Sequence, residues 1–245
     1  MVVSTDRLDR YWAHELGCSI SSLYNGGVST CAPAHREAPR WMGWLIPLEC
    51  ITLDRSAPGT GVISVTPTVA SDLIKYLYGA TTNVLPPHGD ALTPFIRAHF
   101  PHCYPKNHRI LQCDYTSFTP APEIFPISLL PEDDIHASWY RLHFDGPIFV
   151  ARNEKGTIAS WAAIKCKSDE IWEMAVVTET RYRGMGLARS VVSRATLAAL
   201  DAGKVPLYLH DLANTASSRV CLSLGYQHYG YELTCESGRI VPVRY

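Results

Sequence analysis

The chain lacks an excess of charge of either sign. It has 22 lysines and arginines against 23 aspartates and glutamates, so its formal net charge is −1. A basic field is what general binding to nucleic acid or to a membrane surface requires, and we therefore expect neither partner. The chain also has no apolar run of about 20 residues, which a membrane-spanning helix needs, and residues 1–7 do not form a signal peptide. These absences predict a cytoplasmic protein.

Paired cysteine motifs are absent as well. The eight cysteines are scattered and none belongs to a C-x-x-C pair, which argues against a zinc site or a disulfide framework. The nearest approach to a metal cluster, His99, His102 and Cys103, includes a proline and is typical of a loop. We expect no metal, and free thiols that pack as small hydrophobic groups.

Two common phosphate-binding fingerprints are also missing. A P-loop requires Gly-Lys-Ser/Thr, and the glycine-rich run 183–188 does not contain it. A dinucleotide fingerprint requires a third glycine, and Arg189 stands at that position. The run nevertheless lies between a strand-like stretch, 171–178, and a helix-like stretch, 187–202. A helix start offers unpaired backbone N–H groups and partial positive charge, and glycine lets an anion approach the backbone. The pattern therefore predicts a phosphate or pyrophosphate site.

This run also fits the pattern Arg-x-x-Gly-x-Gly/Ala, in two registers, 181–186 and 183–188. That pattern resembles the acyl-coenzyme A site of the GNAT superfamily of N-acyltransferases. Residues 173–188 are similar to the fourth strand, the turn and the following helix of that superfamily, and 206–210, 214–217 and 224–226 match its next strand and helix in order. The resemblance covers roughly residues 125–245, and the first half of the chain has no signature that we can place.

A stretch with two prolines, Thr119 to Glu123, is the best candidate for a domain boundary. We predict an N-terminal α/β domain at 1–118 and, by resemblance, a GNAT acyltransferase domain at 124–245. The implied fold is α/β (α+β), with a mixed, mostly antiparallel sheet flanked by helices. A strand at 61–65 followed by a helix at 68–78 loosely repeats the later pattern, so the first domain is expected to be either a degenerate GNAT-like half or a substrate cap.

The resemblance implies where the cofactor binds. The pantetheine arm would pair with the strand, the pyrophosphate would lie on the glycine turn with an arginine beside it, and the head of the next helix would contact the arm. Asn214 either contacts the cofactor or caps that helix, as asparagine often does. The implied residues are Ala175, Val176, Val177, Arg181, Arg183, Gly184, Met185, Gly186, Leu187, Ala188, Asn214 and Ser217.

The general base is left open among three residues. Glu173 matches the acid of the small-molecule branches, Glu170 matches that of the histone-acetylating branch, and His210 has a side chain suited to proton transfer at neutral pH. We favour Glu173. The superfamily has its general acid, a tyrosine, four residues before Gly225, and here that position is Cys221. The chain therefore has no tyrosine at the position that would protonate the leaving thiolate.

The function that the resemblance implies is direct transfer of an acetyl or other acyl group from acyl-CoA to the amine of a small molecule. Trp139, Tyr140, His143 and Asp145 stand where acceptor loops usually lie, and each is equally explained as a core or loop residue. One alternative is a non-catalytic acyl-CoA sensor, which the missing tyrosine favours. A second alternative is an acyltransferase whose donor is an acyl carrier protein.

Overall fold

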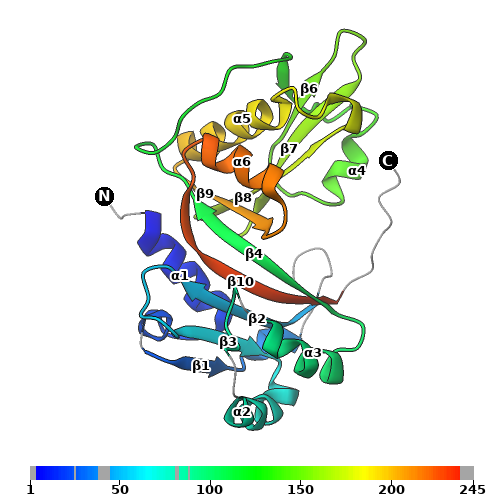
Figure 1. Ribbon diagram of the computed structural model, residues 1–245. Coiled ribbons are helices and arrows are strands. Elements are labelled where there is room, and N and C mark those ends of the chain that lie inside the picture. Colours follow the sequence, from blue (N-terminus) through cyan, green and yellow to red (C-terminus); the bar gives the residue numbers. More distant parts are fainter. Residues whose placement is uncertain (1–3, 25, 38–44, 81–82, 88, 238–245) are drawn as a thin grey trace. The chain divides into compact units, whose positions relative to one another are not determined.

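The computed structural model describes residues 4–24, 26–37, 45–80, 83–87 and 89–237 (Figure 1). Its contacts divide the chain into two compact units. The first unit comprises residues 1–8 and 110–228, and the second comprises 9–109 and 229–245. The chain passes between the units within three elements: α1 (Ser4–Leu16), β4 (Tyr104–Gln112) and β10 (Gln227–Ser237). We describe each unit by itself.

The first unit is a sheet with helices packed on it. Its strands follow the order β9-β8-β7-β6-β5, in which neighbours are antiparallel except for the parallel pair β8 and β9. The strands are β5 (Ile127–Leu129), β6 (Ile148–Arg152), β7 (Ile158–Cys166), β8 (Ile171–Thr178) and β9 (Val205–Asp211), and the helices are α4 (Ala137–Arg141), α5 (Leu187–Asp201) and α6 (Thr215–Ser223).

The two faces of this sheet carry different cores. Side chains alternate between faces along a strand, and on β8 the even-numbered residues, such as Met174, pack into the cluster that includes α5 and α6. On β7, Trp161 and Ala163 pack with Ala137 and Tyr140 of α4. Residues 161, 163 and 165 of β7 and the odd-numbered residues of β8 therefore share the face that bears α4, because Ala163 lies opposite Ala175 in the register.

The proline-containing stretch 119–123 lies inside the first unit and does not separate the two units. Serine hydroxyls of α5 bind its backbone. Ala121 donates its N–H to Ser193 Oγ at 2.9 Å, and Ser190 Oγ donates to the carbonyl of Pro122 at 2.6 Å. α5 thus holds this stretch against the first unit, and the domains expected at 1–118 and 124–245 stay a prediction.

The second unit contains a sheet with the strand order β1-β3-β2-β10-β4. β1 and β3 are parallel, whereas β2 is antiparallel to both β3 and β10. Its core includes residues of β2, β3, β10, α2 and α3. The elements not yet given are β1 (Val28–Cys31), β2 (Leu45–Leu53), β3 (Gly61–Val65), α2 (Ala70–Gly79) and α3 (Thr93–His99).

The predicted fold class, mixed α/β with a mostly antiparallel sheet flanked by helices, is confirmed. The strands and helices expected at 61–65, 68–78, 171–178, 187–202 and 206–210 are present within about two residues, whereas the sequence did not predict β1 and α3. Residues 240–243, whose sequence is also typical of a strand, lie outside the described residues. The degenerate-half hypothesis stays a prediction, although β3 is followed by α2 as expected. Among the described residues, no helix has both the length and the apolar character needed to cross a bilayer.

A buried ion pair ties together the second unit. Arg36 is fully buried, and its guanidinium donates to Glu49 Oε2 and to Ser64 Oγ, both at 2.5 Å. It also donates to the carbonyls of Glu15 and Ile46 at 3.1 Å. The arginine therefore joins the end of α1 to β2 and β3.

Replacing Arg36 with methionine is expected to destabilise the protein by about 3–5 kcal/mol, because the Glu49 carboxylate would remain buried without its counter-charge. Urea unfolding followed by circular dichroism measures this loss. The control is Lys75→Met, since Lys75 is 77% exposed and pairs at 3.2 Å with Asp72, which is 46% exposed. A pair of that kind contributes about 1 kcal/mol or less. An equal loss of unfolding free energy in the two variants would contradict the structural role of Arg36.

Candidate functional site

The glycine turn joins β8 to α5 as the sequence predicts. A short 3-10 turn, Thr180–Tyr182, follows β8. Gly184 and Gly186 then have φ angles of +80° and +85°, values in the left-handed region that favours glycine. Gly186 is the N-cap of α5, and no side chain caps this helix of 15 residues. The first backbone N–H groups of α5 are therefore available to an anion.

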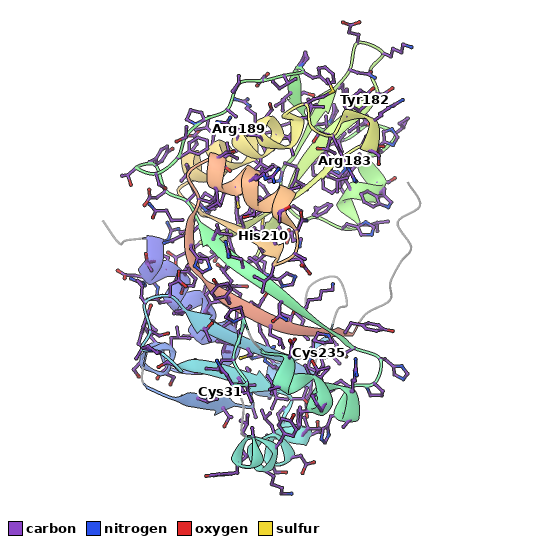
Figure 2. All side chains as sticks on the ribbon, viewed as in Figure 1. Cys31, Tyr182, Arg183, Arg189, His210 and Cys235 are labelled. Atoms are coloured by element: carbon purple, nitrogen blue, oxygen red, sulfur yellow. The ribbon has the colours of Figure 1, made fainter. Side chains whose placement is uncertain are left out.

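The turn is open and carries positive charge. Residues 183–186 are exposed, and a Cβ placed on Gly184 would meet no atom within 4 Å. Arg183 Nε donates to the carbonyl of Thr178 at 3.3 Å, while the guanidinium of Arg181 lies 4.8 Å from the centre of the Tyr182 ring. Figure 2 labels Tyr182 and Arg183. The donor set, backbone amides with two arginines nearby, fits a pyrophosphate group.

β8 and β9 diverge beyond their first residues. Their parallel pairing runs from Ile171 opposite Val205 to Glu173 opposite Leu207. β8 continues to Thr178 and β9 to Asp211, and over these described residues no pairing joins the two strands. The edge of β8 that faces β9 is therefore not paired with β9 at residues 175–177, and the backbone groups of this edge can bind an extended ligand.

Glu173 stands on β8 beside this divergence. It is 7% exposed, and it lies on the sheet face that bears α4. Its Oε1 accepts from Lys165 Nζ at 2.8 Å, and its Oε2 lies 3.5 Å from Lys167 Nζ. The side chain is thus a buried carboxylate with a cationic neighbour at each oxygen, an arrangement that suits either proton transfer or a structural ion pair.

Glu170 and His210 do not share this environment. Glu170 precedes β8, is 44% exposed, and accepts from Arg7 Nε at 2.9 Å. His210 is buried on β9, and its Nδ1 lies 2.8 Å from the carbonyl of Asp211. Because Leu207 is the partner of Glu173, strand alternation places His210 on the opposite face, where its ring lies 6.4 Å from that of Tyr208. Of the three candidate bases, Glu173 alone lies on the α4 face at the divergence.

The head of α6 is a capped helix start. Asn214 is its N-cap, and the side-chain oxygen accepts from the N–H of Ser217 at 3.0 Å. The hydroxyl of Ser217 in turn lies 2.9 Å from that of Tyr208, and burial raises the pKa of Tyr208 to about 12. Capping of α6 by Asn214 is therefore observed, and contact of Asn214 and Ser217 with a cofactor stays a prediction.

Cys221, which stands in place of the tyrosine acid, is a core residue. It is fully buried on α6, and its thiol lies 3.2 Å from the carbonyl of Ser218. It belongs to the core cluster that also contains Tyr208 and Tyr226. Burial also raises the pKa of Tyr226, whose hydroxyl lies 2.8 Å from that of Thr196.

The residues suggested as acceptor lining gather on the α4 face. The rings of Trp139 and His143 stack at 4.5 Å, and Tyr140 lies 5.2 Å from Trp161 of β7. Asp145 accepts the backbone N–H of Cys166 at 2.8 Å. Trp161 shares its face of β7 with Lys165, so this aromatic cluster and Glu173 lie on the same side of the sheet.

The sequence reasoning missed Lys165 and Lys167 as partners of Glu173. The signal was present in the hairpin, because a turn centred near Asp169 places Lys165 directly opposite Glu173 in an antiparallel register. Within the described residues, no group of three histidine, cysteine or acidic side chains is placed to hold a metal ion.

Comparison with known proteins agrees with this geometry. Residues 145–233 match the family model described as GNAT acetyltransferase. No curated protein matches the chain significantly.

Several solved structures are similar to the chain. A GCN5-related N-acetyltransferase-like protein from Streptococcus suis is 20% identical with a TM-score of 0.48, over 72% of this chain and 78% of that one. A GCN5-related N-acetyltransferase from Sphaerobacter thermophilus is 13% identical with a TM-score of 0.47, over 72% and 71%. A GNAT-family acetyltransferase from Colwellia psychrerythraea is 12% identical with a TM-score of 0.45, over 72% and 76%. The predicted resemblance is confirmed over a segment: residues 145–233 of this chain resemble the GNAT acetyltransferases.

Proposed function

We propose that the protein is an N-acyltransferase that moves an acetyl or other acyl group from acyl-CoA to the amine of a small molecule. The observation that carries the proposal is the start of α5, where a glycine N-cap without a capping side chain follows the two arginines of the turn after β8. The match of 145–233 to the GNAT acetyltransferase model supports an acyl-CoA ligand at this position.

In this proposal the backbone does most of the binding. The amides of Gly184, Met185, Gly186, Leu187 and Ala188 hold the pyrophosphate, with Arg183 or Arg181 beside it. The unpaired edge of β8 at 175–177 holds the pantetheine arm in an extended form, and one of its N–H groups stabilises the oxyanion. Acyl-CoA supplies the activated thioester carbonyl. The two substrates bind together, so that positioning accounts for much of the rate.

Glu173 is the proposed general base. It lies on the α4 face near the divergence of β8 and β9, together with the aromatic cluster around Trp139 and Trp161. Accepting a proton from the substrate ammonium there would require Lys165 or Lys167 to loosen its contact with the carboxylate. With Cys221 buried in the core, the departing thiolate would take its proton from water.

The second candidate is an acyl-CoA sensor without turnover. Two observations favour it: Cys221 replaces the expected acid, and both oxygens of Glu173 lie near lysine ammonium groups. A sensor would bind acyl-CoA and release no coenzyme A in the presence of amines. A donor attached to an acyl carrier protein is the third candidate, and it would give release from the acyl carrier and none from free acyl-CoA.

Replacing Arg183 with alanine is expected to weaken acetyl-CoA binding by on the order of tenfold, because a charge-assisted contact to the pyrophosphate is lost. Isothermal titration calorimetry with acetyl-CoA measures this change. Arg181→Ala is the matched control, since Arg181 is engaged with the Tyr182 ring and should lose less affinity. If the dissociation constant for acetyl-CoA is unchanged in Arg183→Ala and much higher in Arg181→Ala, the contact to the pyrophosphate belongs to Arg181 and to the register 181–186.

A further inference from the structure

Two thiols of the second unit, Cys18 and Cys31, are in hydrogen-bond contact with each other. Cys18 follows α1, and its N–H donates to the carbonyl of Ala13 at 2.9 Å. Cys31 is the last residue of β1, where it lies opposite Ser64 of β3, and Figure 2 labels it. Both cysteines are free and partly exposed, so a small oxidant can reach them.

The segments that carry the two thiols are fastened to each other. Gly17 has a φ of +70°, and a Cβ built on it would lie only 2.6 Å from the Cβ of Pro33. The carbonyl of Glu15 lies 3.0 Å from His35 Nε2 and accepts from the Arg36 guanidinium at 3.1 Å. These contacts hold the residues just before Cys18 against the residues just after Cys31, so the approach of Cys18 to Cys31 is built into the packing.

The two thiols are not equivalent. The hydrogen bond from Cys18, helped by the nearby charge of Arg36, lowers the pKa of Cys31 to about 7 against the opposing effect of burial. The same hydrogen bond, followed by burial and the charge on Cys31, raises the pKa of Cys18 far above its ordinary value. Near neutral pH, Cys31 is therefore partly thiolate and Cys18 is the thiol that donates to it.

Other thiols of the chain are shifted in the opposite direction. Burial raises the pKa of Cys50 and of Cys166, and it raises that of Cys113 to about 11. Since the thiolate is the reactive form, these residues react slowly at neutral pH. Cys31 is thus distinguished from all three by its environment, and from Cys50 and Cys113 also by its exposure.

We propose that Cys18 and Cys31 are a redox-active pair which a hydroperoxide converts into an intramolecular disulfide. The Cys31 sulfur attacks the terminal oxygen of the hydroperoxide, an S–O bond forms, the O–O bond breaks, and the leaving oxygen takes a proton to become water or an alcohol. The Cys18 sulfur then attacks the resulting sulfenic acid, the S–S bond forms, the S–O bond breaks, and water leaves with the proton of Cys18. Two thiols lose two electrons and the hydroperoxide gains them.

The direct test treats the reduced full-length protein with hydrogen peroxide, blocks the remaining thiols with iodoacetamide, and analyses peptides by mass spectrometry. Trypsin places both cysteines in one peptide, 11–36, and chymotrypsin cleaves it after Tyr24. The expected product is a peptide pair that stays joined after this cleavage, lighter by two hydrogens than its reduced parts. Unjoined halves, each alkylated on its single cysteine after peroxide treatment, would overturn the proposal.

Three variants distinguish the roles. Cys18→Ser should stop the reaction at a sulfenic acid on Cys31, which dimedone captures, whereas Cys31→Ser should leave Cys18 unoxidised. Cys166→Ser, a partly exposed thiol of the first unit, should form the disulfide as the unaltered protein does.

The rate of alkylation gives a readout that does not depend on oxidation. At pH 7, Cys31 should react with iodoacetamide at least about threefold faster than Cys166, because its larger thiolate fraction outweighs the lower nucleophilicity of a more acidic thiol. Its rate should be half-maximal near pH 7. Faster labelling of Cys166, or capture of sulfenic acid on it first, would contradict the assignment.

Discussion

Replacing Gly225 with alanine is expected to destabilise the first unit by about 3 kcal/mol or more. Gly225 has a φ of +86°, which costs a residue with a Cβ about 1–2 kcal/mol. In addition, the new Cβ would lie 1.8 Å from the carbonyl oxygen of Ser117, a contact that only a shift of the backbone relieves. The neighbouring hydrogen bond from Thr119 N–H to the Leu224 carbonyl, 3.0 Å long, holds the two segments together and opposes that shift.

Gly156→Ala is the matched control for this prediction. Gly156 has a φ of +76°, close to that of Gly225, but a Cβ there would meet no atom within 4 Å. Gly156→Ala should therefore lose only the free energy that a left-handed backbone conformation costs a residue with a Cβ, about 1–2 kcal/mol. Denaturant unfolding of the two variants, followed by circular dichroism, measures the difference. Equal denaturant midpoints for the two variants would show that the Ser117 carbonyl does not exclude a side chain at position 225.

Replacing Glu173 with glutamine is expected to lower the rate of acyl transfer by about 10²–10⁴-fold, since a positioned general base contributes that much. Acetyl-CoA affinity should be unchanged, because the proposed cofactor contacts are the backbone of β8 and the turn before α5. Glutamine keeps the shape of the side chain, and the two lysines that lose their counter-charge are 26% and 27% exposed, so folding should be little affected. Steady-state coenzyme A release and acetyl-CoA titration together test both parts.

Glu170→Gln is the control for this variant, because Glu170 is partly exposed and pairs with Arg7 before β8 begins. Its turnover should stay within about twofold of the unaltered protein, as surface ion pairs contribute little. If Glu173→Gln keeps full turnover while Glu170→Gln or His210→Asn loses it, the base belongs to that other residue. If Glu173→Gln loses only stability, Glu173 is a structural ion-pair partner of its lysines.

The sequence was sufficient to predict the glycine turn because local chemistry determines it. Strand, left-handed glycines and helix follow one another within residues 171–201, and the observed positive φ angles of Gly184 and Gly186 require the residue type that is present. The Asn214 cap is local as well, since asparagine accepts from the backbone three residues ahead. Both features depend on residues close together in the chain.

What the sequence did not predict depends on contacts between distant residues. β1 is four residues long with alternating exposed and half-buried positions, and its pairing with β3 joins residues more than 30 positions apart. The stretch 119–123 resembled a linker, but Ser190 and Ser193 of α5 bind its backbone. The ion pairs of Glu173 follow from strand register, which a search for motifs along the chain does not consider.

The central claim, that the chain transfers an acyl group from acyl-CoA to an amine, is tested most directly by coenzyme A release. Mass spectrometry should follow free coenzyme A in mixtures of the protein, acetyl-CoA and a pooled library of small amines, because the protein's own eight cysteines would react in a colorimetric thiol assay. The account predicts release that depends on an amine and that falls in both Arg183→Ala and Glu173→Gln. Saturable binding of acetyl-CoA without release for any amine would contradict it and would favour the sensor.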